Sequence, residues 1–399
     1  MDLIEQYNLI IWVGAPIGGL LVALLAWRVM RNTQPARAGL IPESPDPELT
    51  DEFGGEDEED SGDAYGGPSP AVHDLEPPPP PAVGLAALRV RDPAFSEPVL
   101  VAELAQLFAA AWTARGSGEL GSLSERFSDG GREAMLAGRH GAVREVLVAA
   151  PTLLDVAVGD VWANVEARFE ALVTEVRDGA ATTSVVTERW ALARQLEARG
   201  PWIMRQLESR ELAPLARPPL ERGSEVEPGT SLATLMAPDL EVQREALLAS
   251  HPDLDLDALS AWLLDFHGRV LSALDAADPA ALGDLITADL RGTLELETAR
   301  LARTGLRARH EDAAASAAEL CRVQRDPRFE LLTLRVHASC RTWLEDEAGQ
   351  PVSGSTEHPR IYSEYWTLLR PVVGEAAFAR GRQGFVLWRI QDDEAYNGG

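Results

Sequence analysis

Acid–base chemistry is the first activity that individual side chains of this sequence suggest. A general acid or base is usually an imidazole or a carboxylate whose pKa has been shifted by burial. The candidates are Glu364, His267, His337 and His358, but no histidine and aspartate stand at a spacing that guarantees their contact. Because most such histidines are satisfied core residues, the pattern favours a structural role and leaves catalysis as an alternative.

Composition argues against several other kinds of site. All 36 basic residues are arginine, so the lysine of a P-loop and the lysine of a Schiff-base enzyme are both absent. The seven histidines show no HxH, HxxxH or HExxH spacing, and the chain has no CxxC. We therefore predict a non-enzymatic protein without a cofactor or metal. Whether Cys321 and Cys340 form a disulfide or remain free thiols is left open.

Two heptapeptides share the pattern Glu-x-Trp-x-Leu-x-Arg. They begin at Glu188 and Glu364, and the shared side chains alternate along the chain, so they project from one face of a strand. Large apolar side chains on such a face usually pack in a core, and they also form the walls of apolar pockets. The candidate pocket-lining residues are Trp190, Leu192, Trp366, Leu368, His337 and Glu364.

The internal repeat extends beyond this motif. Residues 112–135 align without a gap on residues 271–294, and each stretch follows the apolar stripe of an amphipathic helix. We predict two α+β copies, each with helices followed by an antiparallel sheet. The predicted helices span 97–115, 119–149, 255–276 and 279–318. The predicted strands span 152–162, 164–176, 182–194, 201–208, 320–326, 328–343, 359–371 and 384–391.

Three arginines follow in the second copy. Arg300, Arg303 and Arg307 have the spacing of one face of the predicted helix. Such a row is usually a solvated stripe that offsets nearby acids. The alternative is a face that binds a partner or the acidic segment upstream.

The first 90 residues have the composition of an anchor and a tether. After a short tail at 1–8, residues 9–30 form an apolar run long enough to span a bilayer. Three arginines lie at its C-terminal end or just beyond it, so the positive-inside rule places the N-terminus outside and the body in the cytoplasm. Residues 31–90 are acidic and rich in proline, which predicts a disordered linker.

The net charge of the chain is concentrated in that linker. The formal net charge is −27, and residues 38–88 hold thirteen acidic residues and no arginine or lysine. This balance argues against binding of nucleic acid through a basic face.

The early helix pair, the long hairpin and the (Thr/Ser)-Glu-x-Trp-x-Leu-x-Arg strand of each copy together resemble the Tim44-like domain. Behind a membrane anchor, the two copies are similar to a bacterial membrane-anchored member of that family. The resemblance implies one domain at 91–215 and another at 251–396, joined by a linker at 216–250. It also implies a cone-shaped, NTF2-like fold, in which helices pack on a curved antiparallel sheet.

The resemblance implies a membrane-associated adaptor or scaffold, in the class that serves protein translocation or assembly. We expect a single-pass protein of a bacterial-type inner membrane that binds a protein partner, a lipid or another apolar ligand. NTF2-like cones also house enzymes, so a membrane-tethered enzyme or a carrier of a small apolar molecule is the alternative. A cavity with a buried acid or histidine would favour that alternative, whereas a cavity filled by Trp and Leu would favour the scaffold.

Overall fold

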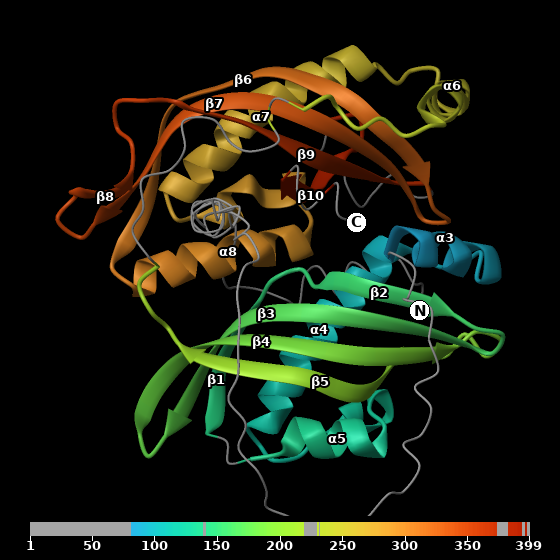
Figure 1. The fold of residues 1–399 in the computed structure, drawn as a ribbon, viewed down its shortest axis with the longest axis vertical. Helices are drawn as coiled ribbons and strands as arrows, with labels where there is room; N and C mark the ends of the chain where they lie inside the picture. Colours follow the sequence, from blue (N-terminus) through green and yellow to red (C-terminus); the bar gives the residue numbers. More distant parts are fainter. Residues whose placement is uncertain are drawn as a thin grey trace, which may run out of the picture.

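The structure is a computed structural model that describes residues 81–138, 141–218, 230, 232–372, 382–392 and 396. The described chain forms two halves, and in each half helices pack on a curved antiparallel sheet (Figure 1). The predicted α+β class is therefore confirmed for this part of the chain. The predicted membrane span at 9–30 lies outside the described residues, as does the linker up to residue 80. Among the helices that are described, none is long and apolar enough to cross a membrane.

The first half begins with helices and ends with a sheet. Its helices are α3 (Pro81–Arg91), α4 (Glu97–Arg115), the 3₁₀ helix η1 (Gly121–Arg126) and α5 (Asp129–Leu136). Its strands are β1 (Ala142–Val148), β2 (Thr152–Val158), β3 (Trp162–Arg177), β4 (Ala180–Gln195) and β5 (Ile203–Pro214). The strand order is β1-β3-β4-β5, and β2 pairs with β3 beyond the end of β1. One edge is thus an interrupted strand, with Pro151, which has no N–H for the ladder, at the interruption.

The second half repeats this succession. Its helices are α6 (Leu240–Ser250), α7 (Leu256–Asp275), the 3₁₀ helix η2 (Pro279–Leu285) and α8 (Ala288–Arg303). Its strands are β6 (Leu306–Arg325), β7 (Phe329–Asp346), β8 (Pro351–Gly354), β9 (Arg360–Pro371) and β10 (Val386–Asp392). The order across the sheet is β6-β7-β9-β10, and β8 pairs with the end of β7. β6 therefore takes the edge position that β1 and β2 share in the first half.

The same hydrogen bond ties the helices to the last strand in both halves. Ser128 N donates to the carbonyl oxygen of Met204 at 2.9 Å, and Thr287 N donates to that of Leu387 at 3.0 Å. The side chains of Ser128 and Thr287 also cap the helices that follow them, α5 and α8. The two halves thus agree in local hydrogen bonding as well as in strand order.

Two predicted helices, 119–149 and 279–318, were wrong in their C-terminal parts. α5 ends at 136 and α8 at 303, and the chain then continues as edge strands. Gly305, at φ +70°, follows α8, and this left-handed backbone favours glycine at a helix end. β6 is rich in alanine, which favours helix, but it pairs with β7 along its whole length. Pairing in the sheet outweighs a local preference of less than about 1 kcal/mol per residue.

The predicted linker at 31–90 was wrong in its last ten residues, which belong to α3. This helix packs on β2 through the buried side chains of Leu85 and Leu88. The approach is close, since a Cβ atom at Gly84 would lie 1.9 Å from the carbonyl oxygen of Val156. The first half therefore begins with a helix that the proline-rich composition concealed.

The predicted linker at 216–250 also contains ordered structure. α6 occupies its end, and the segment before α6 lies against the second sheet. Leu235 N donates to Tyr365 Oη at 3.1 Å, and Ala237 N donates to the carbonyl oxygen of Cys321 at 2.9 Å. Residues 232–250 therefore belong to the second half.

Helix α8 contacts both halves of the molecule (Figure 1). One side carries Leu290, Leu294 and Leu301 into the core of the second half. The other side packs Leu296 against Leu147 of β1 and the neighbouring β3, on the face of the first sheet that points away from α4 and α5. A single helix thus packs in the core of the second half and also against the sheet of the first half.

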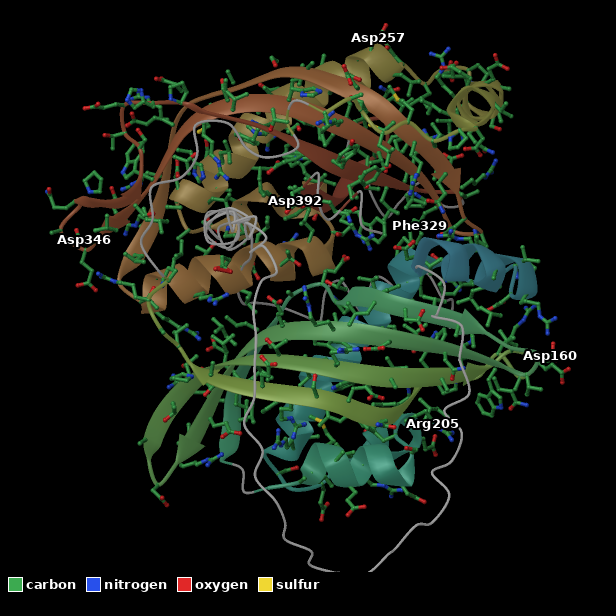
Figure 2. All side chains as sticks on the ribbon, in the orientation of Figure 1. Asp160, Arg205, Asp257, Phe329, Asp346 and Asp392 are labelled. Atoms are coloured by element: carbon green, nitrogen blue, oxygen red, sulfur yellow. The ribbon has the colours of Figure 1, made fainter. Side chains whose placement is uncertain are left out.

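Further contacts join the two halves beside α8. Ser96 Oγ donates to Asp326 Oδ2 at 2.7 Å, and both side chains are buried. Phe329, labelled in Figure 2, packs in one apolar cluster with Val101 of α4 and Trp388 of β10. The halves therefore share an interface with an apolar centre and a buried hydrogen bond.

Candidate functional site

The Glu-x-Trp motif makes the same internal hydrogen bond in each half. Trp190 Nε1 donates to Glu188 Oε2 at 2.6 Å, and Trp366 Nε1 donates to Glu364 Oε2 at 2.8 Å. All four side chains are buried. Because residues i and i+2 of a strand share a face, each glutamate satisfies the indole N–H of its own strand without help from another element.

In the first half this glutamate is also part of an ion pair. Arg210 of β5 donates to Glu188, and the Glu188 side chain is 0% exposed. The Arg210 guanidinium lies 5.3 Å from the ring centroid of Trp112. The carboxylate is thus compensated by one charged and one neutral donor, which explains how it tolerates burial.

Aromatic side chains fill the interior of the first half. Trp190 packs against Phe169 at 4.7 Å and against Phe108 at 5.3 Å between ring centroids. Leu192 belongs to the same core cluster. The structure thus places the predicted pocket residues Trp190 and Leu192 in a filled core.

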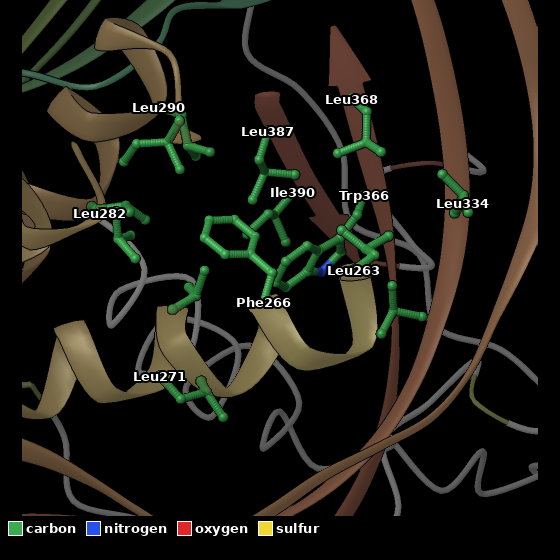
Figure 3. Packing of buried hydrophobic residues seen from close by; sticks show 14 of the residues in the cluster. Leu263, Phe266, Leu271, Leu282, Leu290, Leu334, Trp366, Leu368, Leu387 and Ile390 are labelled. Atoms are coloured by element: carbon green, nitrogen blue, oxygen red, sulfur yellow. The ribbon is translucent and has the colours of Figure 1, made fainter. Parts of the chain in front are cut away.

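Trp366 and Leu368 occupy the corresponding core of the second half. Trp366 lies edge-on to Phe266 of α7, with ring centroids 6.5 Å apart, and Figure 3 shows Ile390 beside them. Both side chains are almost fully buried. The two leucines and two tryptophans of the motif therefore pack alike in the two halves.

The second half contains two pairs of polar side chains, one buried and one reaching the surface at Asp275, that the first half lacks. His267 Nε2 lies 2.8 Å from Tyr362 Oη, and His310 Nδ1 lies 2.7 Å from Asp275 Oδ1. The His267 residue is 1% exposed and the His310 side chain 2% exposed. We refer to these four residues, Asp275, His267, His310 and Tyr362, as the polar cluster.

The electrostatics of the polar cluster favour a neutral His267. Burial lowers the pKa of His267 below its ordinary value, nearby Glu364 opposes that shift, and His310 adds to it. His310 faces a carboxylate, which only accepts hydrogen bonds, so its Nδ1 atom carries the proton. The sequence concealed this pairing, because Asp275 and His310 lie 35 positions apart.

The alignment of the halves shows what each polar residue replaces. His267 corresponds to Phe108, and it packs on Trp366 at 5.6 Å and 37°, as Phe108 packs on Trp190 at 5.3 Å and 37°. Glu364 of β9 corresponds to Glu188 of β4. Tyr362, two residues before Glu364, therefore takes the place of Val186.

His310 of the cluster, and Asp392 outside it, follow the same rule. His310 lies opposite Thr342 on β7, the position at which Val143 lies opposite Glu175 in the first half. Opposite Glu364 stands Asp392 at the end of β10 (Figure 2), where the first half has Arg210 opposite Glu188. Polar groups in the second half thus occupy positions that are apolar or oppositely charged in the first.

The remaining predicted histidines lie outside this interior. His337 projects from the opposite face of β7 to Leu334 and Val336, and its Nε2 is 3.8 Å from Glu319 Oε2. His358 is exposed, in the turn before β9, and its backbone N donates to Ser355 Oγ. The structure therefore does not bring His337 together with Trp366 and Glu364 in one pocket.

The three arginines of the predicted partner face are divided between two elements. Arg300 and Arg303 end α8, but Arg307 lies on β6, so the three do not form one helical face. Arg303 Nη2 lies 2.5 Å from Glu145 Oε2 of the first half, and Arg300 Nη1 lies 3.9 Å from Glu297 Oε2. Two of the three thus meet carboxylates within this chain.

The two cysteines are free and buried. They lie on adjacent strands, but Cys321 is level with residues 333–334 of β7, whereas Cys340 is level with Glu311 and Ala314 of β6. Burial raises the pKa of Cys321 to about 12 and that of Cys340 to about 11. The structure therefore supports the interpretation of two free thiols.

A hollow of about 560 Å³ opens at one end of the second half. It lies between the ends of α7 and α8, the start of β6 and the hairpin that joins β7 to β8. Its lining is mixed: it includes the apolar Leu274, Leu301, Leu306 and Ala308, the acidic Glu345, Asp346 and Glu347, and the basic Arg307. In the described part of the chain, no group of three or more His, Cys, Asp or Glu side chains is arranged to hold a metal ion.

Comparison with known families agrees with the architecture of the second half. The Tim44-like domain matches residues 247–380. The match runs from the end of α6 through β9 and contains the second Glu-x-Trp motif and the polar cluster. The resemblance inferred from the sequence is thus confirmed for this segment, and no curated protein matches the chain.

Proposed function

We propose that this protein is a membrane-anchored adaptor built from two tandem Tim44-like domains. The match of the Tim44-like domain to residues 247–380 carries this proposal, because it associates the second half with protein translocation at membranes. In this proposal the first half is a degenerate second copy of the same domain. The pair would hold a protein partner near the bilayer.

Four correspondences support the tandem arrangement. The strand order, the Glu-x-Trp hydrogen bond and the bond from Ser128 or Thr287 to the last strand recur in both halves. The register shift near the start of the last strand also recurs, at Arg205 in β5 and at Trp388 in β10. Such bulges are specific features of a fold, and their recurrence favours duplication over coincidence.

Membrane attachment is proposed from the sequence of residues 9–30. An apolar run of this length suits a bilayer core, and the arginines after it favour a cytoplasmic body in a bacterial-type inner membrane. The acidic residues that follow would repel an anionic leaflet and hold the body away from it. The docked halves would then act as one rigid platform at the end of a tether.

The packing of the first half favours an adaptor over an enzyme there. Trp190, Phe108 and Phe169 fill the space in which an enzyme of this shape would hold its substrate. Of the acid–base candidates from the sequence, which all lie in the second half, Glu364 accepts a hydrogen bond from Trp366 in the core and His337 lies on the outer face of the sheet.

Fractionation of the full chain and of a variant without residues 9–30 tests the proposal. We expect the full chain to stay in the membrane pellet after alkaline carbonate extraction and the shortened chain to become soluble. Photo-crosslinkers at exposed positions of both halves, applied in intact membranes, should trap a discrete protein partner. A carbonate-extractable full chain, or the absence of any crosslink that depends on the anchor, would contradict the adaptor role.

A further inference from the structure

A small aromatic cluster lies on the outer face of the second sheet. Trp366 of β9 points into the core beneath α7, so its neighbour Tyr365 points away from α7. The ring of Tyr396 stacks on that of Tyr365, with ring centroids 3.7 Å apart and an angle of 9° between the planes. Cys321 of β6 completes the cluster, and these last three residues are all buried. A residue four positions beyond the end of β10 thus packs on two other strands of the sheet.

The two residues that hold Tyr396 are also bonded to the segment before α6. Leu235 N donates to Tyr365 Oη at 3.1 Å, and Ala237 N donates to the carbonyl oxygen of Cys321 at 2.9 Å. Neither hydrogen bond involves Tyr396. The surroundings of the tyrosine are therefore fixed without it, and they should persist when its ring leaves.

Arginines lie beside the aromatic rings. The Arg322 guanidinium is 5.3 Å from the ring centroid of Tyr396, and the Arg335 guanidinium is 5.6 Å from that of Tyr365. A cation near the face of an aromatic ring attracts it. In the sequence, three acidic residues at 392–394 precede Tyr396 and complement these positive charges. We refer to the site formed by Cys321, Tyr365, Arg322 and Arg335 as the tyrosine slot.

The fit of Tyr396 in the slot is incomplete. Its Oη atom is buried, and no group in the described part of the chain forms a hydrogen bond with it. Stacking on Tyr365 favours the docked ring, whereas the buried hydroxyl opposes docking, because water would satisfy it in the undocked state. Phenylalanine would keep the stacking without this penalty. A hydroxyl at this position therefore favours a reversible contact over a permanent one.

We propose that the tyrosine slot binds an aromatic residue preceded by acidic residues, and that the chain's own C-terminal segment occupies it reversibly through Tyr396. While it is docked, this segment excludes any other peptide of the same chemistry. The slot lies on the second sheet and needs neither the anchor nor a partner at the membrane. It can therefore be tested separately from the adaptor role.

The two free cysteines report on docking in the full chain. Tyr396 packs on Cys321, whereas Cys340 belongs to the core cluster on the other face of the sheet. We expect Tyr396→Ala to speed the alkylation of Cys321 by iodoacetamide at least about tenfold, because a thiol must be exposed and deprotonated to react. Alkylation of Cys340 should stay within about twofold of its rate in the natural protein. Mass spectrometry of the two cysteine peptides measures both rates.

Tyr396→Phe should have the opposite effect. The docked ring no longer buries a hydroxyl without a partner, so alkylation of Cys321 should be severalfold slower than in the natural protein. This variant keeps the test decisive if Tyr396→Ala loosens the whole second half and both cysteines react faster.

A labelled peptide tests the slot itself. A fluorescein-labelled peptide of residues 391–399 should bind the Tyr396→Ala protein saturably, as measured by fluorescence anisotropy. The natural protein should bind it at least about tenfold more weakly, because its own segment competes at a high local concentration. The same peptide with Tyr396→Ala should not bind. A peptide with its three acidic residues changed to their amides should bind more weakly than the natural one.

Any of three results would overturn the proposal. The first is unchanged alkylation of Cys321 in Tyr396→Ala, and the second is alkylation in Tyr396→Phe that is as fast as in the natural protein or faster. The third is peptide binding that is absent, equal in the two proteins, or independent of the tyrosine or of the acidic residues.

Discussion

At the scale of single residues, the Glu-x-Trp motif owes its recurrence to a buried hydrogen bond. The indole N–H of a core tryptophan needs an acceptor, and the glutamate two residues earlier supplies it from the same face of the strand. Burial of that glutamate then requires a compensating group. In the first half this group is Arg210 of the neighbouring strand.

Removing the charge of Glu188 should therefore be costly. We expect Glu188→Gln to lower the free energy of unfolding by about 3 kcal/mol or more, because the amide leaves the nearly buried Arg210 without its carboxylate. Urea unfolding followed by tryptophan fluorescence measures this loss.

Glu166→Gln is the matched control on the outer face of the same sheet. Glu166 pairs with Arg189 across β3 and β4, but both side chains are partly exposed. This change should cost less than about 1 kcal/mol. Equal losses in the two variants would show that burial does not determine the strength of the Glu188 pair.

At the scale of elements, the interrupted edge of the first sheet and helix α8 complement each other. The strand breaks at Pro151, and the backbone N–H of Ala150 just before it donates to Thr293 Oγ1 of α8 at 2.8 Å. The approach is close at this point, since a Cβ atom at Gly292 would lie 3.0 Å from the carbonyl oxygen of Val148. A backbone N–H beside the interruption of one sheet thus finds its acceptor on a helix of the other half.

Thr293→Val should weaken the contact between α8 and the first sheet without changing the size of the side chain. We expect a loss of about 1 kcal/mol in the free energy of unfolding, because the part-buried N–H of Ala150 loses its acceptor. The comparison is Thr298→Val on the same helix. The Thr298 hydroxyl only donates to the Leu294 carbonyl oxygen within α8, so its loss should be the smaller of the two. The reverse order would contradict the docking role of Thr293.

At the scale of the whole molecule, the interface between the halves contains a buried acid. Glu297 of α8 is 1% exposed, with Arg300 at 3.9 Å. Burial raises the pKa of Glu297 from 4.5 to about 8, Arg300 opposes the shift, and Glu170 of the first half adds to it. The carboxyl group is therefore protonated in the folded protein at neutral pH.

This acid makes stability depend on pH in a defined direction. Between pH 4.5 and about pH 8 the folded protein holds a proton that the unfolded chain has released, so stability falls as pH rises. Relative to Glu297→Gln, the natural protein should lose about 1.4 kcal/mol per pH unit in this window and nothing further above it. Unfolding free energies of both proteins across the window provide the measurement. A difference that is constant with pH, or that grows in favour of the natural protein, would contradict it.

The agreement between sequence and structure is uneven for physical reasons. Helices α4 and α7 and strands β7 and β9 were predicted to within about two residues at most ends, because their apolar patterns are long and periodic. Strand β1 and the first part of β6 were not, because they fall in segments predicted as helix; alanine-rich β6 acquires its structure from pairing with β7. The buried Glu364 was recognised as a candidate and His267 as well, but His310 was not, because only the crossing of β6 and α7 brings it to Asp275.

The sequence by itself determined the repeated motif and the alternating faces of the motif strands, since each depends on residue types at fixed spacings along the chain; the anchor at 9–30 stays a prediction. Only the tertiary structure decided which positions meet: the contact of α8 with the interrupted strand, the burial of Glu297 between the halves and the polar cluster in the second half. Those features arise from contacts between residues distant in sequence, and the energy of such contacts depends on burial, which a local pattern does not specify.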